Sequence, residues 1–393
     1  DEMILTAREM EKRGLTIPLL IGGATTSLAH TALRIAPEYS GPVVYVPDAS
    51  RSPAVVRALL SGTERYKFLE ELERAYLEAA ERHRSIQNRI ELLTLEKARE
   101  NRLCLDWQSL PSPPSPIPEP LELRDYPITP LIPHIDWAGF LRAWDLGLLS
   151  PGGDDQGRKA AEEKLLEDAR LLLDQVIARK LLRLRGLVSF FPALAEGDDM
   201  LLYDPRGNTE VIARFSFLRN QEKKQAGRPN PCLADFVPPK TLGRAGLIGL
   251  FALSAGFGLA EGEAAFQARR DDYGALLLKS LANCLAEAFT EEVHRKVCPE
   301  KSRGIRPAFG YPACPDHQDK GIVFKLLQAR ERCGLELTES AMIFPAASTC
   351  GMFFFNPASY YFGTGPVGDD QLRDWAERKG ISAAEARKRI GRI

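Results

Sequence analysis

The residues best suited to chemistry lie in one short stretch, Arg306 to His317, which reads Arg-Pro-Ala-Phe-Gly-Tyr-Pro-Ala-Cys-Pro-Asp-His. Its three prolines and one glycine cannot continue a helix or a strand, so we expect a shaped loop that presents backbone atoms in a fixed geometry. Arg306 supplies a planar guanidinium that suits a carboxylate or a phosphate. Gly310 lets the backbone approach another group closely. The stretch therefore predicts a binding loop.

Cys314 and His317 raise a second chemistry, because a Cys-x-x-His pair is half of a zinc site and a thiol can act as a nucleophile. A structural zinc site needs a second pair of ligands at suitable spacing, and the sequence offers none. We therefore expect no metal here and interpret His317 as part of the loop.

The overall composition narrows the class of partner. Lysine and arginine number 52 against 53 acidic residues in 393, so the bulk charge favours neither nucleic acid nor a membrane surface. The seven cysteines form no Cys-x-x-Cys pair, which argues against a disulfide framework and for a reducing compartment. No signal peptide opens the chain, and the longest apolar run, 246–260, is too short to cross a bilayer. We expect a cytoplasmic protein that binds no nucleic acid and no membrane.

Residues 1–63 alternate between helical and strand patterns, which predicts the back part of a doubly wound α/β (Rossmann-like) domain. Two strands cannot form such a sheet alone, and the first residue is Asp1 rather than methionine, so we expect a fragment of a longer polypeptide. The Gly-Gly-Ala-Thr-Thr-Ser run at 22–27 follows a strand, where such sheets bind ligands, although a simple tight turn is the alternative. Helices are expected at 2–13, 29–36 and 52–60, and strands at 17–21 and 43–46.

Residues 64–133 form a predicted linker, because a charged helical stretch to Asn101 is followed by a proline-rich run, 109–133, that favours an extended path. Residues 134–393 mix long helices with strands. Helices are expected at 137–149, 158–185, 261–297, 320–333, 370–379 and 382–390. Strands are expected at 187–191, 200–203 and 209–217 as an antiparallel meander, at 247–253, and at 342–348 and 352–355 as a hairpin. Asp198 and Asp199 fall in a predicted turn, where such a pair is usually solvated.

The binding loop resembles the activation domain of cobalamin-dependent methionine synthases, whose S-adenosylmethionine loop reads Arg-Pro-Ala-x-Gly-Tyr-Pro-Ala-Cys-Pro-x-His. Further segments resemble that family at 135–137, 190–193, 232–237 and 285–289, and segments 21–27 and 45–50 look like the second half of its cobalamin-binding domain. The resemblance implies an α+β activation domain with a bent, mainly antiparallel sheet flanked by helices, preceded by a partial cobalamin-binding segment. The implied boundaries are 1–63, 64–133 and 134–393.

The resemblance also implies which residues contact S-adenosylmethionine. Arg306 would pair the carboxylate, Asp136 and Glu287 would balance the cationic groups, and backbone atoms of Ala308 and Gly310 would fix the adenosyl portion. From the pattern alone, Asp136 caps the following helix and Glu287 lies on a solvent-facing row of its helix. The aromatic residues implied to lie against the ligand are Tyr311, Tyr361 and Phe362; on pattern alone the last two are core residues.

Some family features are missing or altered. The implied contacts to the cobalamin nucleotide tail are Gly22, Gly23, Ala24, Thr25 and Ala49. The family's Asp-x-His-x-x-Gly motif, whose histidine ligates cobalt, occurs nowhere in the sequence, so we expect an incomplete cobalamin site. In the activation domain, Phe344 stands where the family has tryptophan, and Asn356-Pro357 stands where it has His-Pro.

The implied function is reactivation: the domain binds S-adenosylmethionine and reductively methylates cob(II)alamin to restore methylcobalamin. The implied partners are the cobalamin, homocysteine and folate modules of methionine synthase, together with a flavodoxin or similar reductase that supplies one electron. Because cobalt accepts the methyl group, no base or nucleophile is required from the chain. The alternative is a non-catalytic S-adenosylmethionine-binding or interaction module, which would bind the ligand without methyl transfer.

Overall fold

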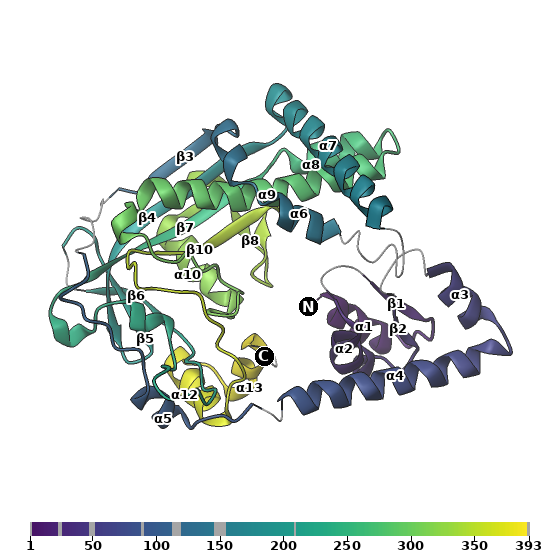
Figure 1. The fold of residues 1–393 in the computed structure, drawn as a ribbon, viewed down its shortest axis with the longest axis horizontal. Coiled ribbons are helices and arrows are strands. Elements are labelled where there is room, and N and C mark those ends of the chain that lie inside the picture. Colours follow the sequence, from purple (N-terminus) through teal and green to yellow (C-terminus); the bar gives the residue numbers. More distant parts are fainter. Residues whose placement is uncertain are drawn as a thin grey trace. The chain divides into compact units, whose positions relative to one another are not determined.

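The structure is a computed structural model that describes residues 2–22, 26–46, 52–87, 90–111, 119–144, 155–207 and 210–390 (Figure 1). The chain divides into two compact units, one formed by residues 1–90 and 138–166 and the other by residues 91–137 and 167–393. The second unit holds the predicted binding loop. No helix among the described residues is long and apolar enough to cross a membrane.

The N-terminal part of the first unit is a small parallel pair of strands with helices. Strands β1 (Leu19–Ile21) and β2 (Val43–Tyr45) pair in parallel, as the alternation predicted. The predicted helix at 29–36 is instead a short α-helix, a π-turn at Thr31–Ile35 and a 3-10 turn, because Pro37 has no N–H to continue the α-helical ladder. The helices of this part are α1 (Glu2–Lys12), α2 (Leu28–His30), α3 (Ser52–Leu60) and α4 (Glu64–Gln87).

The second unit is built on one six-stranded antiparallel sheet of order β10-β7-β4-β5-β6, with β3 also pairing β4. Strand β4 pairs with β3 through its first half, with β5 through its second half, and with β7 along its length. The predicted meander is confirmed as β4-β5-β6. The strands are β3 (Leu121–Tyr126), β4 (Arg183–Glu196), β5 (Asp199–Tyr203), β6 (Val211–Ser216), β7 (Gly246–Phe257) and β10 (Ser348–Phe354).

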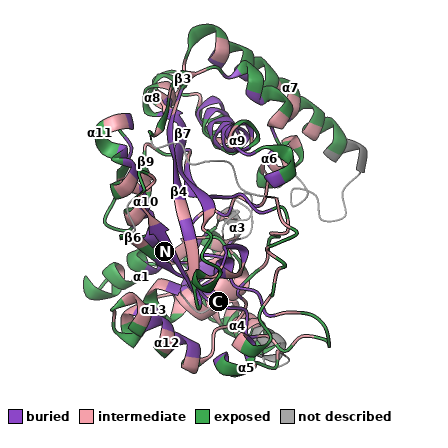
Figure 2. Ribbon diagram, turned by 90° about the vertical axis from the view of Figure 1, so that its left-hand side faces the viewer, coloured by how far each residue is buried: buried purple, intermediate pink, exposed green. Residues whose placement is uncertain are grey.

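Helices cover both faces of this sheet, as Figure 2 shows for α9 on one side of β4 and β7 and α10 with α11 on the other. Alternate residues of each strand therefore face different helices: Leu250 belongs to the core beneath α10, whereas the Phe251 ring stacks on that of Phe353, which α9 covers. The helices are α5 (Leu95–Glu100), α8 (Leu259–Gln267), α9 (Asp272–Val297), α10 (Lys320–Leu327), α11 (Ala329–Cys333), α12 (Asp369–Lys379) and α13 (Ala383–Ile390). Helices α6 (Trp137–Trp144) and α7 (Asp155–Arg179) contribute residues to both units.

Several elements differ from the prediction. The single helix predicted at 320–333 is broken at Gln328, which has φ +51°, into α10 and α11, and the one predicted at 261–297 is divided into α8 and α9. The predicted hairpin is wrong: Ser348–Phe354 is β10, which pairs with β7, and residues 343–344 form a separate strand, β9, that pairs with β8 (Glu336–Leu337). Helix α7 ends at Arg179 rather than Arg185, because the alternating buried residues Leu182 and Leu184 already follow the period of a strand. Within the proline-rich run, β3 fits between Pro120 and Pro127, so neither proline interrupts its ladder.

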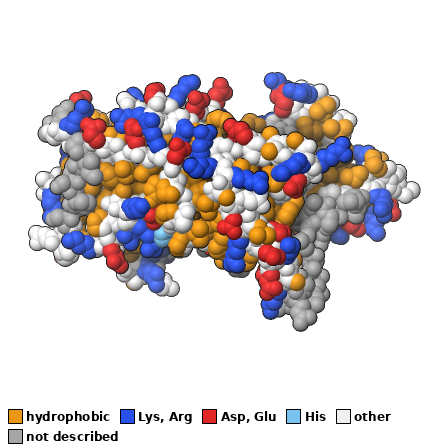
Figure 3. Space-filling view, turned by 90° about the horizontal axis from the view of Figure 1, so that it is seen from above, with side chains coloured by type: hydrophobic (Ala, Val, Ile, Leu, Met, Phe, Trp, Pro, Cys, Tyr) orange, Lys and Arg blue, Asp and Glu red, His pale blue; other side chains and the backbone are white. Residues whose placement is uncertain are grey.

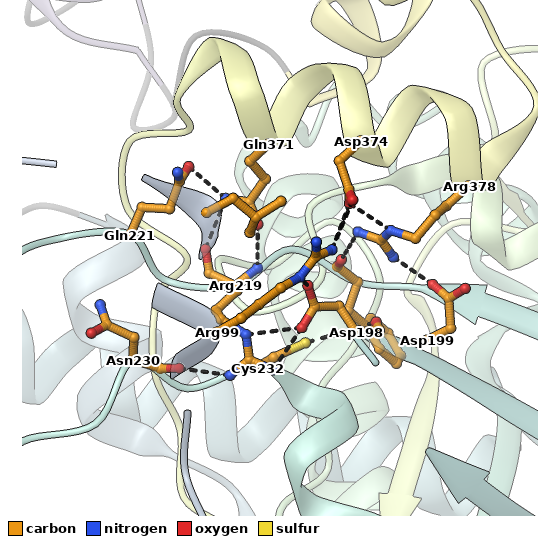
Figure 4. Close-up of polar contacts among 12 residues, drawn as sticks. Arg99, Asp198, Asp199, Arg219, Gln221, Asn230, Cys232, Gln371, Asp374 and Arg378 are labelled. Carbon is orange, nitrogen blue, oxygen red and sulfur yellow. Dashed lines mark hydrogen bonds and ion pairs between the residues drawn. The ribbon is translucent and has the colours of Figure 1, made fainter. Parts of the chain in front are cut away.

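The expected solvated turn at Asp198 and Asp199 is also wrong, since each residue is only 1% exposed. Arg219, equally buried, donates to Asp198 at 2.6 and 2.8 Å (Figure 4). It also donates to Asp235 at 2.7 and 2.8 Å. Arg99 of α5 adds a second cation on Asp198 at 2.8 Å. Burial alone would raise the pKa of Asp198, but the two arginines outweigh it and lower that pKa, so the carboxylate stays ionised.

Charge is balanced at the surface as well as in the interior. On the face shown in Figure 3, acidic and basic side chains are interspersed with apolar ones, in line with the 52 basic and 53 acidic residues of the chain. No field of a single sign dominates that face.

We expect Asp198→Asn to lower the free energy of unfolding by about 3–5 kcal/mol, because it leaves buried arginine charge without its partner. Denaturant unfolding of the two proteins measures this difference. The matched control is Asp369→Asn, which removes an exposed ion pair to Arg387 and should cost no more than about 1 kcal/mol. Equal effects of the two substitutions would contradict a structural role for the buried network.

Candidate binding site

The predicted binding loop lies along the free edge of β10 and pairs with it as a short irregular strand. The amide of Met352 donates to the Pro307 carbonyl at 3.0 Å, and the amide of Phe309 donates to the Cys350 carbonyl at 3.1 Å. A Cβ added at Gly351 would lie 2.3 Å from the Pro307 carbonyl oxygen, so this close approach requires glycine. The sheet edge therefore fixes the path of the first half of the loop.

The second half of the loop is a tight turn closed by its own residues. Gly310 has φ +96° and donates its amide to the Cys314 carbonyl at 2.8 Å, while the Cys314 thiol donates to the Ala308 carbonyl at 3.0 Å. A Cβ at Gly310 would lie 2.1 Å from Cε1 of His317. Cysteine and histidine thus shape the loop.

The thiol and zinc alternatives find no support in this geometry. Burial raises the pKa of the Cys314 thiol, so the thiolate needed for nucleophilic attack is disfavoured. Among the described residues, no group of three or more histidine, cysteine or acidic side chains is placed to hold a metal ion.

Replacing Gly310 by alanine should destabilise the loop through two effects, the positive φ and the collision with His317. Gly197→Ala separates them, because Gly197 has φ +64° with nothing within 4 Å of an added Cβ. We expect Gly197→Ala to cost about 1 kcal/mol and Gly310→Ala distinctly more, measured by denaturant unfolding. Equal costs would mean that the His317 contact does not constrain the loop.

Arg306 joins the loop to helix α9 through two carboxylates. Its Nε lies 3.1 Å from Oε2 of Glu291, and its Nη1 lies 3.3 Å from Oε2 of Glu287. The remaining nitrogen, Nη2, has no partner among the described residues. Burial would lower the pKa of Arg306, but the glutamate charges outweigh it and raise that pKa, so the guanidinium stays charged.

The two aromatic residues Tyr311 and Tyr361 lie beside this charged group. Tyr361 is 63% exposed, and its hydroxyl accepts the backbone N–H of Arg306 at 3.0 Å. Tyr311 is 58% exposed, and the nearby charge of Glu287, followed by burial, raises its pKa. The N–H of Ala308 has no hydrogen-bond partner among the described residues. Together these groups offer a cation, an exposed carboxylate, two ring faces and an unpaired amide.

Asp136 reaches the same region from a different element. It is exposed and directly precedes α6, the position expected for a helix cap. Burial raises the pKa of Cys284 on α9 to about 11, with further contributions from the charges of Asp136 and Glu287. Asp136 and Glu287 therefore both lie near Cys284 of α9.

The remaining predicted residues differ in their placement. Phe362 is half-buried and packs against Phe236, with ring centroids 6.2 Å apart, so it supports the segment that carries Tyr361. The amide of Gly310 is hydrogen-bonded within the loop, which leaves its carbonyl for a ligand.

The predicted cobalamin contacts lie in residues 1–63. A Cβ at Gly22 would lie 2.8 Å from the Val46 carbonyl oxygen, so close packing of the strands accounts for glycine at this position. The other predicted cobalamin contacts, Gly23, Ala24, Thr25 and Ala49, lie outside the described residues.

The two departures from the family pattern lie in different surroundings. Asn356 is buried, donates to the Phe236 carbonyl at 3.0 Å and accepts the Ala358 amide at 3.0 Å, so it builds the turn before Pro357. Phe344 is exposed on the surface.

Two residues that support the site were not identified from the sequence. Glu291 holds Arg306, and its spacing of four residues from Glu287 was the available signal. Ser359 accepts the Ile305 amide at 3.0 Å, and a Cβ at Gly304 would lie 2.3 Å from its Oγ. The local turn at Asn356 to Ser359 does not reveal this role, because the segment that Ser359 holds, Gly304 and Ile305, lies more than fifty residues earlier.

His294, two turns after Glu287 on α9, is a buried titratable group near this site, because the charges of Glu291 and Arg306 act on its pKa. It is 3% exposed and stacks on Phe353 at 4.8 Å between ring centroids, and its Nε2 has no hydrogen-bond partner in the part of the chain that the structure describes. Burial lowers the pKa of His294 from 6.5 to about 4, so the folded protein holds a neutral imidazole.

Because the unfolded chain binds a proton at His294 that the folded chain excludes, stability should fall as the pH falls from 6.5 to 4. The loss assigned to His294 is about 3 kcal/mol over this window. Unfolding at several pH values, compared with His294→Phe, measures it, since phenylalanine keeps a ring on Phe353 but cannot bind a proton. Parallel pH profiles for the two proteins would exclude this role for His294.

A binding loop on the edge of an antiparallel sheet, faced by a helix that carries acidic residues, defines this part of the chain as a small-ligand-binding α+β domain. The family model described as vitamin B12 dependent methionine synthase, activation domain, matches residues 127–380, and the chain belongs to this family. A crystal structure of the MetH reactivation domain bound to AdoHcy is similar, with 36% sequence identity and a TM-score of 0.68. The match covers 77% of this chain and 98% of that chain, and it confirms the predicted α+β fold.

Proposed function

We propose that the group around Arg306 binds S-adenosylmethionine and that the chain is the reactivation module of a cobalamin-dependent methionine synthase. The observation that carries the proposal is the convergence of Arg306, Glu287, Tyr311 and Tyr361 at one place, in a domain whose solved relative is described as bound to AdoHcy. The charges and ring faces of these residues complement those of the ligand.

The α-carboxylate of the ligand is assigned to Arg306. Its Nη2 has no partner among the described residues and Nη1 has a second N–H, so the planar guanidinium keeps donors for one carboxylate. The two glutamates hold the guanidinium in position and keep it charged before the ligand arrives. The Arg306 side chain therefore loses little conformational entropy when the ligand binds.

The ammonium of the ligand is assigned to the carboxylates of Glu287 and Asp136. The sulfonium loses its charge when the methyl group leaves, whereas the ammonium keeps its charge throughout. A carboxylate against the sulfonium would stabilise the starting state more than the transition state and slow the transfer. We therefore assign Glu287, whose side chain is 53% exposed, to the ammonium. The adenosyl portion is assigned to the Ala308 amide, the Gly310 carbonyl and the faces of Tyr311 and Tyr361, with Phe362 behind Tyr361.

The chain's contribution to the reaction is binding and orientation. S-Adenosylmethionine gives up its methyl group and leaves as S-adenosylhomocysteine. A cobalamin reduced by one electron supplies the nucleophile, so no base is required from this chain. The axial-histidine motif is absent from the sequence and most predicted cobalamin contacts lie outside the described residues, so we assign no step to residues 1–63. The cobalamin, homocysteine and folate modules, a flavodoxin-like reductase, the cytoplasmic location and the boundaries 1–63, 64–133 and 134–393 are parts of this proposal.

Calorimetric titration with S-adenosylmethionine tests the site. Arg306→Ala should weaken binding by about 10- to 100-fold, because a charge-assisted hydrogen-bonded pair is lost. Lys301→Ala is the matched control, since it removes an exposed cation just before the loop and should leave the affinity within about twofold. A folded wild-type chain that does not bind, or equal losses in both variants, would contradict the assignment.

Incubation with a cob(II)alamin protein, S-adenosylmethionine and a one-electron reductant then separates the two candidate functions. Formation of S-adenosylhomocysteine that depends on Arg306 supports reactivation. Binding without S-adenosylhomocysteine formation favours the non-catalytic binding module instead.

A further inference from the structure

A polar cleft of about 190 Å³ lies between strands β3 and β4 and helix α11, built from residues that the proposed function does not use. Several water molecules fit in a cleft of this volume. Arginine dominates its lining, with one contribution from each of the three elements. The side chains of interest are Arg124, Arg185, Arg332, Glu122, Asp125 and Cys333.

The backbone is irregular where the cleft opens. Between β3 and β4, Leu123 pairs with Gly186 and Tyr126 with Leu184, so two residues of β3 face the single residue Arg185. Asp125, inside this bulge, has φ +48°. Strand β4 also shifts register against β7 at Arg185. Bulges of this kind redirect side chains and separate strands. Near Arg185, the pairing of β4 is irregular with both neighbouring strands, β3 and β7.

Arg185 is half-buried and has no carboxylate partner among the described residues. Its guanidinium lies over the ring of Phe257, 4.6 Å from the centroid, which holds the planar group in position while leaving its edge open. A half-buried arginine without a counter-charge is expensive unless an anion pairs with it.

The other charges of the cleft leave a net positive balance. Arg124 and Arg332 share one carboxylate, Glu122, at 2.9 and 3.4 Å. The second acid, Asp125, is exposed, so three arginines stand against two carboxylates. Burial raises the pKa of the Cys333 thiol to about 11, so this buried residue adds no negative charge to the cleft.

We propose that this cleft binds a phosphate-bearing anion, with Arg185 as the principal contact. A diphosphate has enough oxygens to use the free edge of Arg185 together with the outer N–H groups of Arg124 and Arg332. A single carboxylate pairs with one arginine and leaves the other two without an anionic partner. The site is distinct from the loop around Arg306, and its occupancy does not depend on S-adenosylmethionine.

Calorimetric titration of the full chain with inorganic pyrophosphate at low ionic strength tests this proposal. Wild-type protein should bind with a saturable 1:1 isotherm, and Arg185→Gln should weaken binding at least tenfold. Arg183→Gln is the matched control, because Arg183 is exposed on the same strand and does not line the cleft. It should bind within twofold of wild type. Thermal unfolding of each variant establishes that it is folded.

Two further titrations test whether the cleft recognises phosphate through the planar guanidinium of Arg185. Arg185→Lys keeps the charge but not the planar fork, and it should bind more weakly than wild type but more tightly than Arg185→Gln. Citrate, a polycarboxylate of comparable charge, should bind at least tenfold more weakly than pyrophosphate. Any of three outcomes would overturn the proposal: no binding of pyrophosphate by wild-type protein, equal losses of affinity in Arg185→Gln and Arg183→Gln, or equal affinities for citrate and pyrophosphate.

Discussion

The constraint on which much of the second unit depends is the burial of Arg219. A guanidinium removed from water must have every donor satisfied and its charge balanced, and Asp198, Asp235 and the Asn230 carbonyl do this from three different segments. Asp198 in turn accepts Arg99 of α5, and Arg99 pairs with Asp374 of α12. The end of the sheet and two helices distant in sequence are therefore held by one ionic network.

The same helix connects this network to the binding loop. Lys379, the last residue of α12, lies 3.1 Å from Asp316 and also pairs with Asp319, directly after the loop turn. Burial raises the pKa of Asp319 to about 6, and the Lys379 charge opposes that shift. The loop is thus fixed at its start by the β10 edge and at its end by α12. A binding loop anchored at both ends places Arg306 and Tyr311 with little conformational freedom.

The sequence was informative where the relevant partners are close along the chain or share a periodic pattern. The proline and glycine content of 306–317 predicted a shaped loop, and the period of α9 placed Glu287 on a solvent-facing row, where its side chain is 53% exposed. It failed where the deciding partner is distant. Ser348–Phe354 looked like half of a local hairpin because its true partner, β7, lies about a hundred residues earlier. Asp198 and Asp199 looked solvated because their arginines come from other segments.

The pairing of the loop with β10 also has a consequence for solubility. An uncovered edge of an antiparallel sheet is a template on which other chains can add strands and aggregate. By donating and accepting hydrogen bonds along Cys350 to Phe354, residues 305–309 occupy part of that edge with backbone atoms alone. Side chains of the loop are therefore free to diversify for ligand recognition while its backbone path is retained. A shortening of the loop would expose an apolar strand to self-association, so this segment protects the sheet edge in addition to any part it plays in binding.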